Sequence, residues 1–434
     1  MPETDPNYDR THVYTPIGTD TPLTYAESKG RDQNWYIEGR ANYDRSFGNH
    51  KVGGLFLYNQ SRDYYPLYAS GSAMPHQYIP RSYVGLVGRA TWSYLSKYML
   101  DVNVGYNGSE NFAPGKTRFG LFPSISAGWV MTGEKFMEQQ KVLDFLKFRV
   151  AWGRVGNDLG ANSRFMYIPS TWSGSEGYSF GVNNPVTSPA FAISTLGNPE
   201  VTWETADKQN YGVESKFFGN RLSFNFDYFI ENRKGILIKP QSTPGIIATS
   251  LPNMNLGKVK NQGYEVELGW NDKIGNDFSY RINANVSYAR NKIIFKDEVP
   301  KQFDYMNETG GPTGRTKDLY QFVRLYQYSD FITGEDGKLT LNPSLPQPSS
   351  AVSPGDAMYA DLNGDNIVDG NDRFITGYSN RPEYVFGLNM GCEWKGFSLS
   401  MQWTGATHVN KMYEIEYRLS LIHISEPTRP LYIS

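Results

Sequence analysis

The stretch YMLDVNVGY, from Tyr98 to Tyr106, decides the fold of this chain. Successive side chains of a β-strand point to opposite faces of the sheet. One face of this stretch therefore carries only apolar and aromatic residues, which are Tyr98, Leu100, Val102, Val104 and Tyr106. The other face carries Met99, Asp101, Asn103 and Gly105. An apolar face with an aromatic residue at each end is typical of a strand that crosses both interfaces of a membrane.

The stretch FSYRINANVSY, from Phe278 to Tyr288, repeats this alternation. We expect its apolar residues to face lipid, as in the first stretch: Phe278, Tyr280, Ile282, Ala284, Val286 and Tyr288. The polar faces of the chain's strands would then line a hydrated lumen, and they carry Glu38, Arg40, Asp44, Arg89, Asp101, Asn103, Asn225, Asp227, Glu265, Glu267, Arg281 and Asn283. The alternative is the solvated face of a sheet in a soluble carbohydrate-binding β-sandwich. The uniform apolar faces favour an all-β fold of the antiparallel transmembrane β-barrel class.

Turn residues divide the chain into six hairpins, which supply about twelve strands. Five turns are tight, at 48–50, 96–97, 219–220, 275–277 and 395–396, and the remaining hairpin (118–156) has a longer turn with a short helix near 136–143. The connections between hairpins are mostly much longer, at 64–81, 109–117, 157–204, 235–260 and 292–382. Outer-membrane barrels have short periplasmic turns and long external loops. The sequence therefore predicts that the three longest connections lie outside the cell.

Composition excludes several other classes of protein. The chain has 434 residues and a mean hydropathy of -0.53, and it contains no apolar run long enough for a membrane-spanning helix. A net charge of -2 with no basic stripe indicates that nucleic acid is not a partner. The single cysteine, Cys392, falls on an apolar strand face and implies no disulfide. The 31 tyrosines suit the aromatic girdles of a membrane barrel.

Both ends of the chain indicate a piece of a longer protein. The first residues, MPETD, form no apolar signal segment, although an outer-membrane protein must be exported. The stretch LSLIHISEPTR, from Leu419 to Arg429, matches the translation of a common sequencing adapter. We therefore expect residues 1–418 to be a partial barrel and residues 419–434 to be non-native.

One loop has the spacing of a calcium site. The stretch DLNGDNIVDGND, from Asp361 to Asp372, offers oxygen ligands at positions 1, 3, 5, 7, 9 and 12 of a twelve-residue loop. These ligands would be Asp361, Asn363, Asp365, the carbonyl of Ile367, Asp369 and Asp372. Asn366 stands where glycine is usual, and Asp372 is shorter than the usual Glu. The alternative is an Asx-rich turn without metal.

Catalytic patterns are absent from the sequence. No nucleophile stands in an elbow or triad motif, and the five histidines (His12, His50, His76, His408 and His423) lack metal-ligand spacing. The stretch GGPTGRT (310–316) is one residue short of a phosphate loop and has Arg315 in place of lysine. We therefore expect no catalytic residues, no enzyme activity and no cofactor besides calcium.

Five separate stretches, in order, resemble the SusC/RagA-type TonB-dependent transporters of Bacteroidetes outer membranes. They are RFGLFPSISAGWVMTGEKFM (118–137), LKFRVAWGRVGNDLG (146–160), NPEVTWETADKQNYGVE (198–214), NLGKVKNQGYEVEL (255–268) and PGDAMYADLNGDNIVDGNDR (354–373). The resemblance covers roughly 30–418. It implies a large plugged barrel, of about 22 strands in this class of transporter, of which this chain would hold the middle and later part.

The resemblance also implies a function and partners. Members of this family import oligosaccharides, peptides or other nutrients, usually under a SusD-like surface lipoprotein, with energy delivered by TonB through the plug. The expected location is the outer membrane of a Gram-negative bacterium, in contact with its lipid. The alternative is a passive receptor or adhesin barrel. The sequence does not identify the nutrient.

Overall fold

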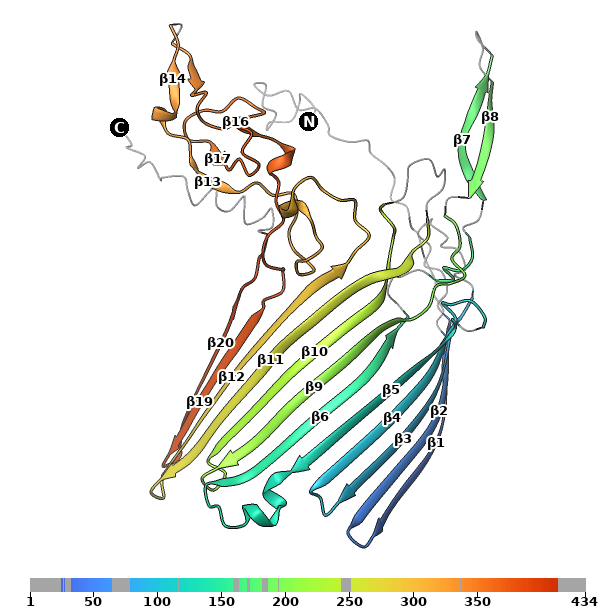
Figure 1. Cartoon of the computed structure of the whole chain (residues 1–434), viewed down its shortest axis with the longest axis vertical. Helices are drawn as coiled ribbons and strands as arrows, with labels where there is room; N and C mark the ends of the chain where they lie inside the picture. Colours follow the sequence, from blue (N-terminus) through green and yellow to red (C-terminus); the bar gives the residue numbers. More distant parts are fainter. Residues whose placement is uncertain are drawn as a thin grey trace, which may run out of the picture.

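A single antiparallel sheet of twelve strands dominates the structure (Figure 1). The computed structural model describes residues 25, 27, 33–64, 79–115, 117–158, 164–169, 172–181, 186–193, 195–242, 251–335 and 337–412. The strands of the sheet pair in the order of the chain. They are β1 (Gln33–Phe47), β2 (His50–Tyr64), β3 (Arg81–Tyr94), β4 (Tyr98–Ser109), β5 (Phe119–Val130), β6 (Leu143–Asn157), β9 (Glu204–Phe217), β10 (Leu222–Ile238), β11 (Met254–Ile274), β12 (Phe278–Phe295), β19 (Tyr384–Trp394) and β20 (Phe397–Thr407).

All six predicted hairpins are confirmed. Positive φ angles make the tight turns, for example at Lys395 (φ 45°) and Gly396 (φ 89°). The longer turn between β5 and β6 contains two short 3-10 helices, η1 (Met131–Gly133) and η2 (Lys135–Met137), so the prediction of a helix near 136–143 was wrong in position. The strands of this sheet have 11 to 21 residues, and β11 is the longest. The short turns lie at the lower end of the sheet and the long connections at the upper end (Figure 1).

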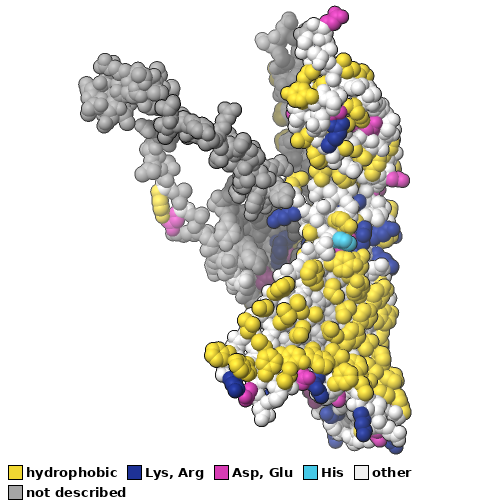
Figure 2. All heavy atoms as spheres, turned by 90° about the vertical axis from the view of Figure 1, so that its left-hand side faces the viewer, with side chains coloured by type: hydrophobic (Ala, Val, Ile, Leu, Met, Phe, Trp, Pro, Cys, Tyr) yellow, Lys and Arg dark blue, Asp and Glu magenta, His cyan; other side chains and the backbone are white. Residues whose placement is uncertain are grey.

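The predicted alternation of apolar and polar side chains is in step between neighbouring strands. Val102 lies opposite Ala90 of β3 and Ile125 of β5, and Asp101 lies opposite Thr91 and Ser126. The apolar faces of individual strands therefore join into one continuous outer face. Figure 2 shows this face as a band of hydrophobic side chains over the lower half of the molecule.

A row of tyrosines marks the upper edge of the band. Five neighbouring strands place one tyrosine each directly opposite the next: Tyr211, Tyr228, Tyr264, Tyr288 and Tyr384. Phe278, ten residues before Tyr288 on β12, lies opposite Trp394 at the lower edge. Ten residues at about 3.4 Å each span ~34 Å along a strand, or ~25 Å along the membrane normal at a tilt of about 40–45°. That height matches the apolar band of an outer-membrane barrel.

The sheet is not closed in the described part of the chain. β1 pairs only with β2, and β20 pairs only with β19. Unpaired backbone groups at such edges cannot be satisfied in lipid. In the described part of the chain, the twelve strands therefore form an open wall of the barrel fold.

Two long connections contain strands that the sequence did not predict. Within 157–204, β7 (Trp172–Phe180) and β8 (Val186–Ile193) form a projecting hairpin (Figure 1). Within 292–382, small two-stranded sheets surround a core of their own. These pairs are β13 (Phe322–Leu325) with β17 (Ala357–Tyr359), β14 (Phe331–Thr333) with β15 (Leu339–Leu341), and β16 (Gln347–Pro348) with β18 (Ile367–Val368). The same connection contains three short 3-10 helices: η3 (Asp304–Met306) before β13, η4 (Tyr328–Asp330) between β13 and β14, and η5 (Gly370–Asp372) after β18.

The core of this loop module packs Tyr326, Phe331, Leu341 and Met358 together. An ion pair closes it, because Arg324 donates two hydrogen bonds, of 2.5 and 2.9 Å, to the carboxylate of Asp330. The Arg324 guanidinium, together with the backbone amide of Gln327, lowers the pKa of Asp330 to about 2. The longest connection is thus a folded module rather than an irregular loop.

A second apolar cluster fills the place where two strands separate. The pairing of β5 with β6 ends at Ser124 and Gly153, although both strands continue upward. Phe112, Val201 and Trp203 occupy this region with Phe122, and the Trp203 indole donates a hydrogen bond to the carbonyl of Arg118 (3.1 Å). This cluster fixes two connections, 109–117 and 157–204, to the upper end of the sheet.

No helix in the described part of the chain is long and apolar enough to span a membrane. The predicted non-native tail, 419–434, and the first residues of the chain lie outside the described residues.

The position of the apolar band leads to a test by matched substitutions in the intact parent barrel. Ala284 lies near the middle of the band, between Leu268 and Leu388, whereas its neighbour Asn283 faces the inner side. Ala284→Arg should destabilise the barrel by about 2–4 kcal/mol, because it places a charge at the bilayer midplane. Asn283→Arg should have little effect. Equilibrium unfolding in lipid vesicles measures both, and equal losses would contradict the assignment of the two faces.

Candidate functional site

The polar inner face of the sheet is the candidate functional site. The register confirms that the twelve polar residues predicted for the lumen share one face; for example, Asn225 lies opposite Glu267, and Asp227 lies opposite Glu265. The same face carries Asp44, Arg89, Asp101 and Asn103 on β1, β3 and β4. This inner wall offers hydrogen-bonding groups from nearly every strand.

On the inner wall, ion pairs join three neighbouring strands from the centre of the strand order, β6, β9 and β10. Arg149 of β6 reaches Glu214 of β9 (Nε to Oε1, 3.0 Å) and Asp227 of β10 (Nη2 to Oδ2, 2.6 Å). Lys147 lies 3.6 Å from the same Glu214 carboxylate. Gly212, between Arg149 and Asp227 in the register, leaves room for the guanidinium, because an added Cβ would lie 2.5 Å from Nε. One oxygen of Asp227, Oδ1, is buried and accepts no hydrogen bond.

A second polar group lies on β3 and β4. The Arg89 guanidinium donates to the Asp101 carboxylate (Nε to Oδ2, 3.0 Å), and the Asn103 amide donates to its other oxygen (2.7 Å). By contrast, the side chains of Arg40, Glu265 and Arg281 make no hydrogen bond or ion pair with any residue in the described part of the chain. These three side chains are free to meet a solute or another part of the protein.

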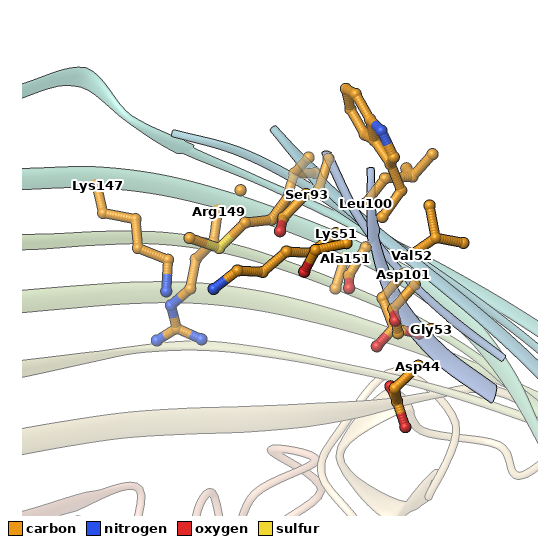
Figure 3. Close-up of a pocket in the computed structure, with 18 of the residues that line it drawn as sticks. Asp44, Lys51, Val52, Gly53, Ser93, Leu100, Asp101, Lys147, Arg149 and Ala151 are labelled. Carbon is orange, nitrogen blue, oxygen red and sulfur yellow. The ribbon is translucent and has the colours of Figure 1, made fainter. Parts of the chain in front are cut away.

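The inner wall is hollowed near the short turns (Figure 3). The hollow has a volume of about 760 Å³ and extends from β1 to β9. Figure 3 shows Lys51, Lys147 and Arg149 converging on one side of it, with Asp44 and Asp101 on another. A surface with separated positive and negative groups can hold a polar partner in a defined orientation.

The sequence alone did not single out Lys147, Arg149 and Glu214. A signal was present in LKFRV (146–150), because Lys147 and Arg149 are two residues apart and must share a strand face. Their partners on β9 and β10 lie about 65 to 80 residues later in the chain, and only the strand register brings them together.

The calcium hypothesis stays a prediction. The six predicted ligands lie in one loop, where the carboxylates accept backbone hydrogen bonds. Asp361 accepts from Gly364 (2.6 Å) and Asn366 (2.7 Å), and buried Asp372 accepts from Leu362 (2.7 Å) and Asp369 (2.8 Å). These bonds are those of an Asx-rich turn. No group of three or more His, Cys, Asp or Glu side chains among the described residues is arranged to hold a metal ion.

In the stretch 310–316, which partly matches a phosphate loop, the side chain of Arg315 binds carbonyl groups of its own turn. The Arg315 guanidinium donates to the carbonyls of Pro312 (3.1 Å), Asn307 (3.1 Å) and Glu308 (2.6 Å). Burial lowers the pKa of Arg315, and the side chain is committed to the local turn.

Comparison with known proteins identifies relatives of the whole described sheet. Residues 3–410 match the family model described as TonB dependent receptor-like, beta-barrel. The chain is 24% identical over 404 residues to TonB-dependent receptor P3 of Formosa agariphila, which covers 85% of this chain and 38% of that protein. It is 25% identical over 329 residues to TonB-dependent receptor SusC of Bacteroides thetaiotaomicron, covering 73% of this chain and 30% of that protein.

Solved structures agree with this fold. Two states of the RagAB peptide importer superpose with TM-scores of 0.63 and 0.64 at 18% sequence identity, and both cover 88% of this chain. They cover 42% and 41% of the solved chain. The chain spans about a third of the length of the curated relatives it matches.

The ion pairs of the inner wall lead to a double-mutant cycle in the intact parent barrel. We expect the loss of stability caused by Arg149→Met and Asp227→Asn together to be smaller than the sum of the two single losses. The difference, which is the coupling energy of the pair, should be about 0.5–1 kcal/mol, because either change alone leaves a charge without its partner. The value is modest because the Arg149 side chain is 39% exposed and solvent screens it. Urea unfolding in vesicles measures the coupling. The same cycle with Arg281→Met, which has no such partner, should give none.

Calcium binding is tested on the loop module. If Asp361, Asn363, Asp365, Ile367, Asp369 and Asp372 bind calcium, millimolar calcium should protect 292–382 of the intact parent from protease, relative to a chelator. Asp361→Ala with Asp365→Ala should abolish this protection. Asp304→Ala with Asp318→Ala removes the same charge from the same module and should retain it. Equal digestion with calcium and with chelator would leave the Asx-rich turn.

Proposed function

The chain belongs to the family of TonB-dependent receptor β-barrels, and from this membership we propose that its parent protein imports a nutrient actively across the outer membrane. Membership places the chain in the outer membrane of Gram-negative bacteria, in agreement with its lipid-facing band and its relatives from Bacteroidetes. The named relatives are receptors and transporters. The import of a nutrient by this protein is the proposal.

The inner wall is the observation that supports import. Its ion pairs and the free side chains of Arg40, Glu265 and Arg281 form a hydrated surface along the inside of the barrel. Such a surface suits a polar solute with many hydrogen-bonding groups, such as an oligosaccharide or a peptide. RagAB is described as a peptide importer, which makes a peptide one of the two candidate classes here.

We propose two protein partners for the parent. TonB would supply energy through a plug inside the barrel, as the family name indicates. A SusD-like surface lipoprotein would cover the loop end, because the chain is similar to SusC and RagAB. Exposed aromatic side chains at that end are suitable contacts, for example Tyr178 and Phe180 on β7 and Phe322 on β13.

The alternative function is a passive receptor or adhesin. It would use the same projecting hairpin and loop module to bind a surface partner, without any transport. The two functions differ in their need for energy, since only import depends on TonB and the proton gradient.

Uptake measurements in cells that make the full-length parent and its lipoprotein partner test this proposal. Fluorescent oligosaccharide and peptide mixtures are the probes, and we expect one class to accumulate in the periplasm. Accumulation should stop when TonB is deleted or when a protonophore collapses the gradient. Surface binding should continue in both cases. Accumulation that is unchanged without TonB, or surface binding of a probe without any accumulation, would favour the passive receptor.

A further inference from the structure

A cluster of positive side chains lies on the outer face of the sheet, directly above the tyrosine row. Figure 2 shows Lys and Arg side chains gathered just above the hydrophobic band. Six residues of β6, β10, β11 and β12 form this cation belt: Arg154, Lys234, Lys258, Lys260, Arg290 and Lys292. All six have the strand parity of the lipid-facing residues below them.

The strand register makes the cation belt continuous. One row runs from Arg154 through Asp207, Asn232 and Lys260 to Lys292, each residue directly opposite the next. Beside this row, Lys234 lies opposite Lys258. The belt therefore contains two directly opposed lysine pairs, Lys260 with Lys292 and Lys234 with Lys258. Like charges opposite one another in a sheet repel and destabilise it, unless an anion lies between them.

Carboxylates of the protein balance only part of the cation belt. Asp207 pairs with Arg154 (2.7 Å) and lies 3.9 Å from Lys234, and Glu383 lies 3.4 Å from Arg290. Within the described part of the chain, Lys258, Lys260 and Lys292 have no ion-pair partner. At the opposite end of the sheet, three cations each lie near a carboxylate: Arg221 near Asp272 (3.2 Å), Lys395 near Asp277 (3.7 Å) and Lys97 near Glu134 (3.9 Å). Three lysines of the cation belt thus lack the protein carboxylate that these three turn-end cations have.

The cation belt begins at the level of the lipid headgroups. Arg290 and Lys292 follow Tyr288 by two and four residues, and Lys258 precedes Tyr264 by six. At about 2.5 Å of height per residue in a tilted strand, these side chains begin ~5–15 Å above the tyrosine row. The headgroup layer occupies about 5–8 Å on each side of the hydrocarbon core, so Arg290 begins inside this layer. Lys292 and Lys258 begin above it, and their long side chains can extend down toward it.

We propose that the cation belt binds the phosphate groups of an anionic lipid in the outer leaflet of the membrane. Apolar chains of that lipid would lie against the hydrophobic band below, and its phosphates would lie between the opposed lysines. The belt faces outward and is continuous with the lipid-facing surface, which favours a membrane lipid over free phosphate. This site is separate from the inner wall and does not depend on transport.

The test uses the full-length protein in detergent, with bisphosphorylated lipid A as the probe and native mass spectrometry as the readout. Wild-type protein should retain lipid A and should bind its dephosphorylated form much more weakly. The triple change Lys258→Gln, Lys260→Gln and Lys292→Gln should weaken lipid A binding by about a hundredfold, because each cation near a charged headgroup contributes about 1 kcal/mol and 1.4 kcal/mol is tenfold.

A matched triple change controls for the loss of charge. Lys97→Gln, Lys273→Gln and Lys395→Gln remove three lysines from the turn end and should leave lipid A binding unchanged. Retention of a heat-modifiable barrel band by both triple variants shows that each still folds. Three results would overturn the proposal: wild-type affinity in the first triple variant, an equal loss in the control, or equal displacement of lipid A by inorganic phosphate.

Discussion

The backbone hydrogen bonds of the twelve-stranded sheet are the constraint on which the rest of the structure depends. Inside a bilayer no water can satisfy an unpaired N–H or C=O group, so each membrane-crossing strand must pair on both sides. The ten strands that lie between β1 and β20 in the sheet meet this demand, because each pairs with a neighbour on both sides, in the order of the chain. The regular register that results decides which side chains meet lipid and which meet one another inside the wall.

The register converts a pattern in single strands into surfaces that cross many strands. One tyrosine per strand becomes a girdle, because Tyr211, Tyr228, Tyr264, Tyr288 and Tyr384 fall at matching positions. The same strand register places Lys260 opposite Lys292 just above this girdle. A soluble protein would gain nothing from two opposed lysine pairs beside a broad apolar band. In an outer membrane the two features suit the two parts of a lipid, its chains and its charged headgroup.

The connections at the two ends of the sheet, the turn end and the loop end, differ in structure. The turn end is closed by short loops with positive φ angles and by paired charges. The loop end carries a projecting hairpin and a module with its own core around Tyr326 and Phe331. Folded connections can present fixed surfaces to a partner, whereas irregular loops of the same length would first have to be ordered at a cost in entropy. The inner wall between the two ends remains polar and partly unpaired.

The sequence by itself determined the class of the fold, the six hairpins and the two faces of the strands, because a strand's alternation and a tight turn's residues are local. It also predicted that long connections share one end of the sheet. It did not predict β7 and β8 or the folded module, since their strands are short and lack a lipid-facing pattern. Only the tertiary structure joined Arg149 to Glu214 and Asp227, and Lys260 to Lys292. These partners lie 32 to 78 residues apart in the chain, and a shift of one residue in pairing would have turned each side chain to the opposite face.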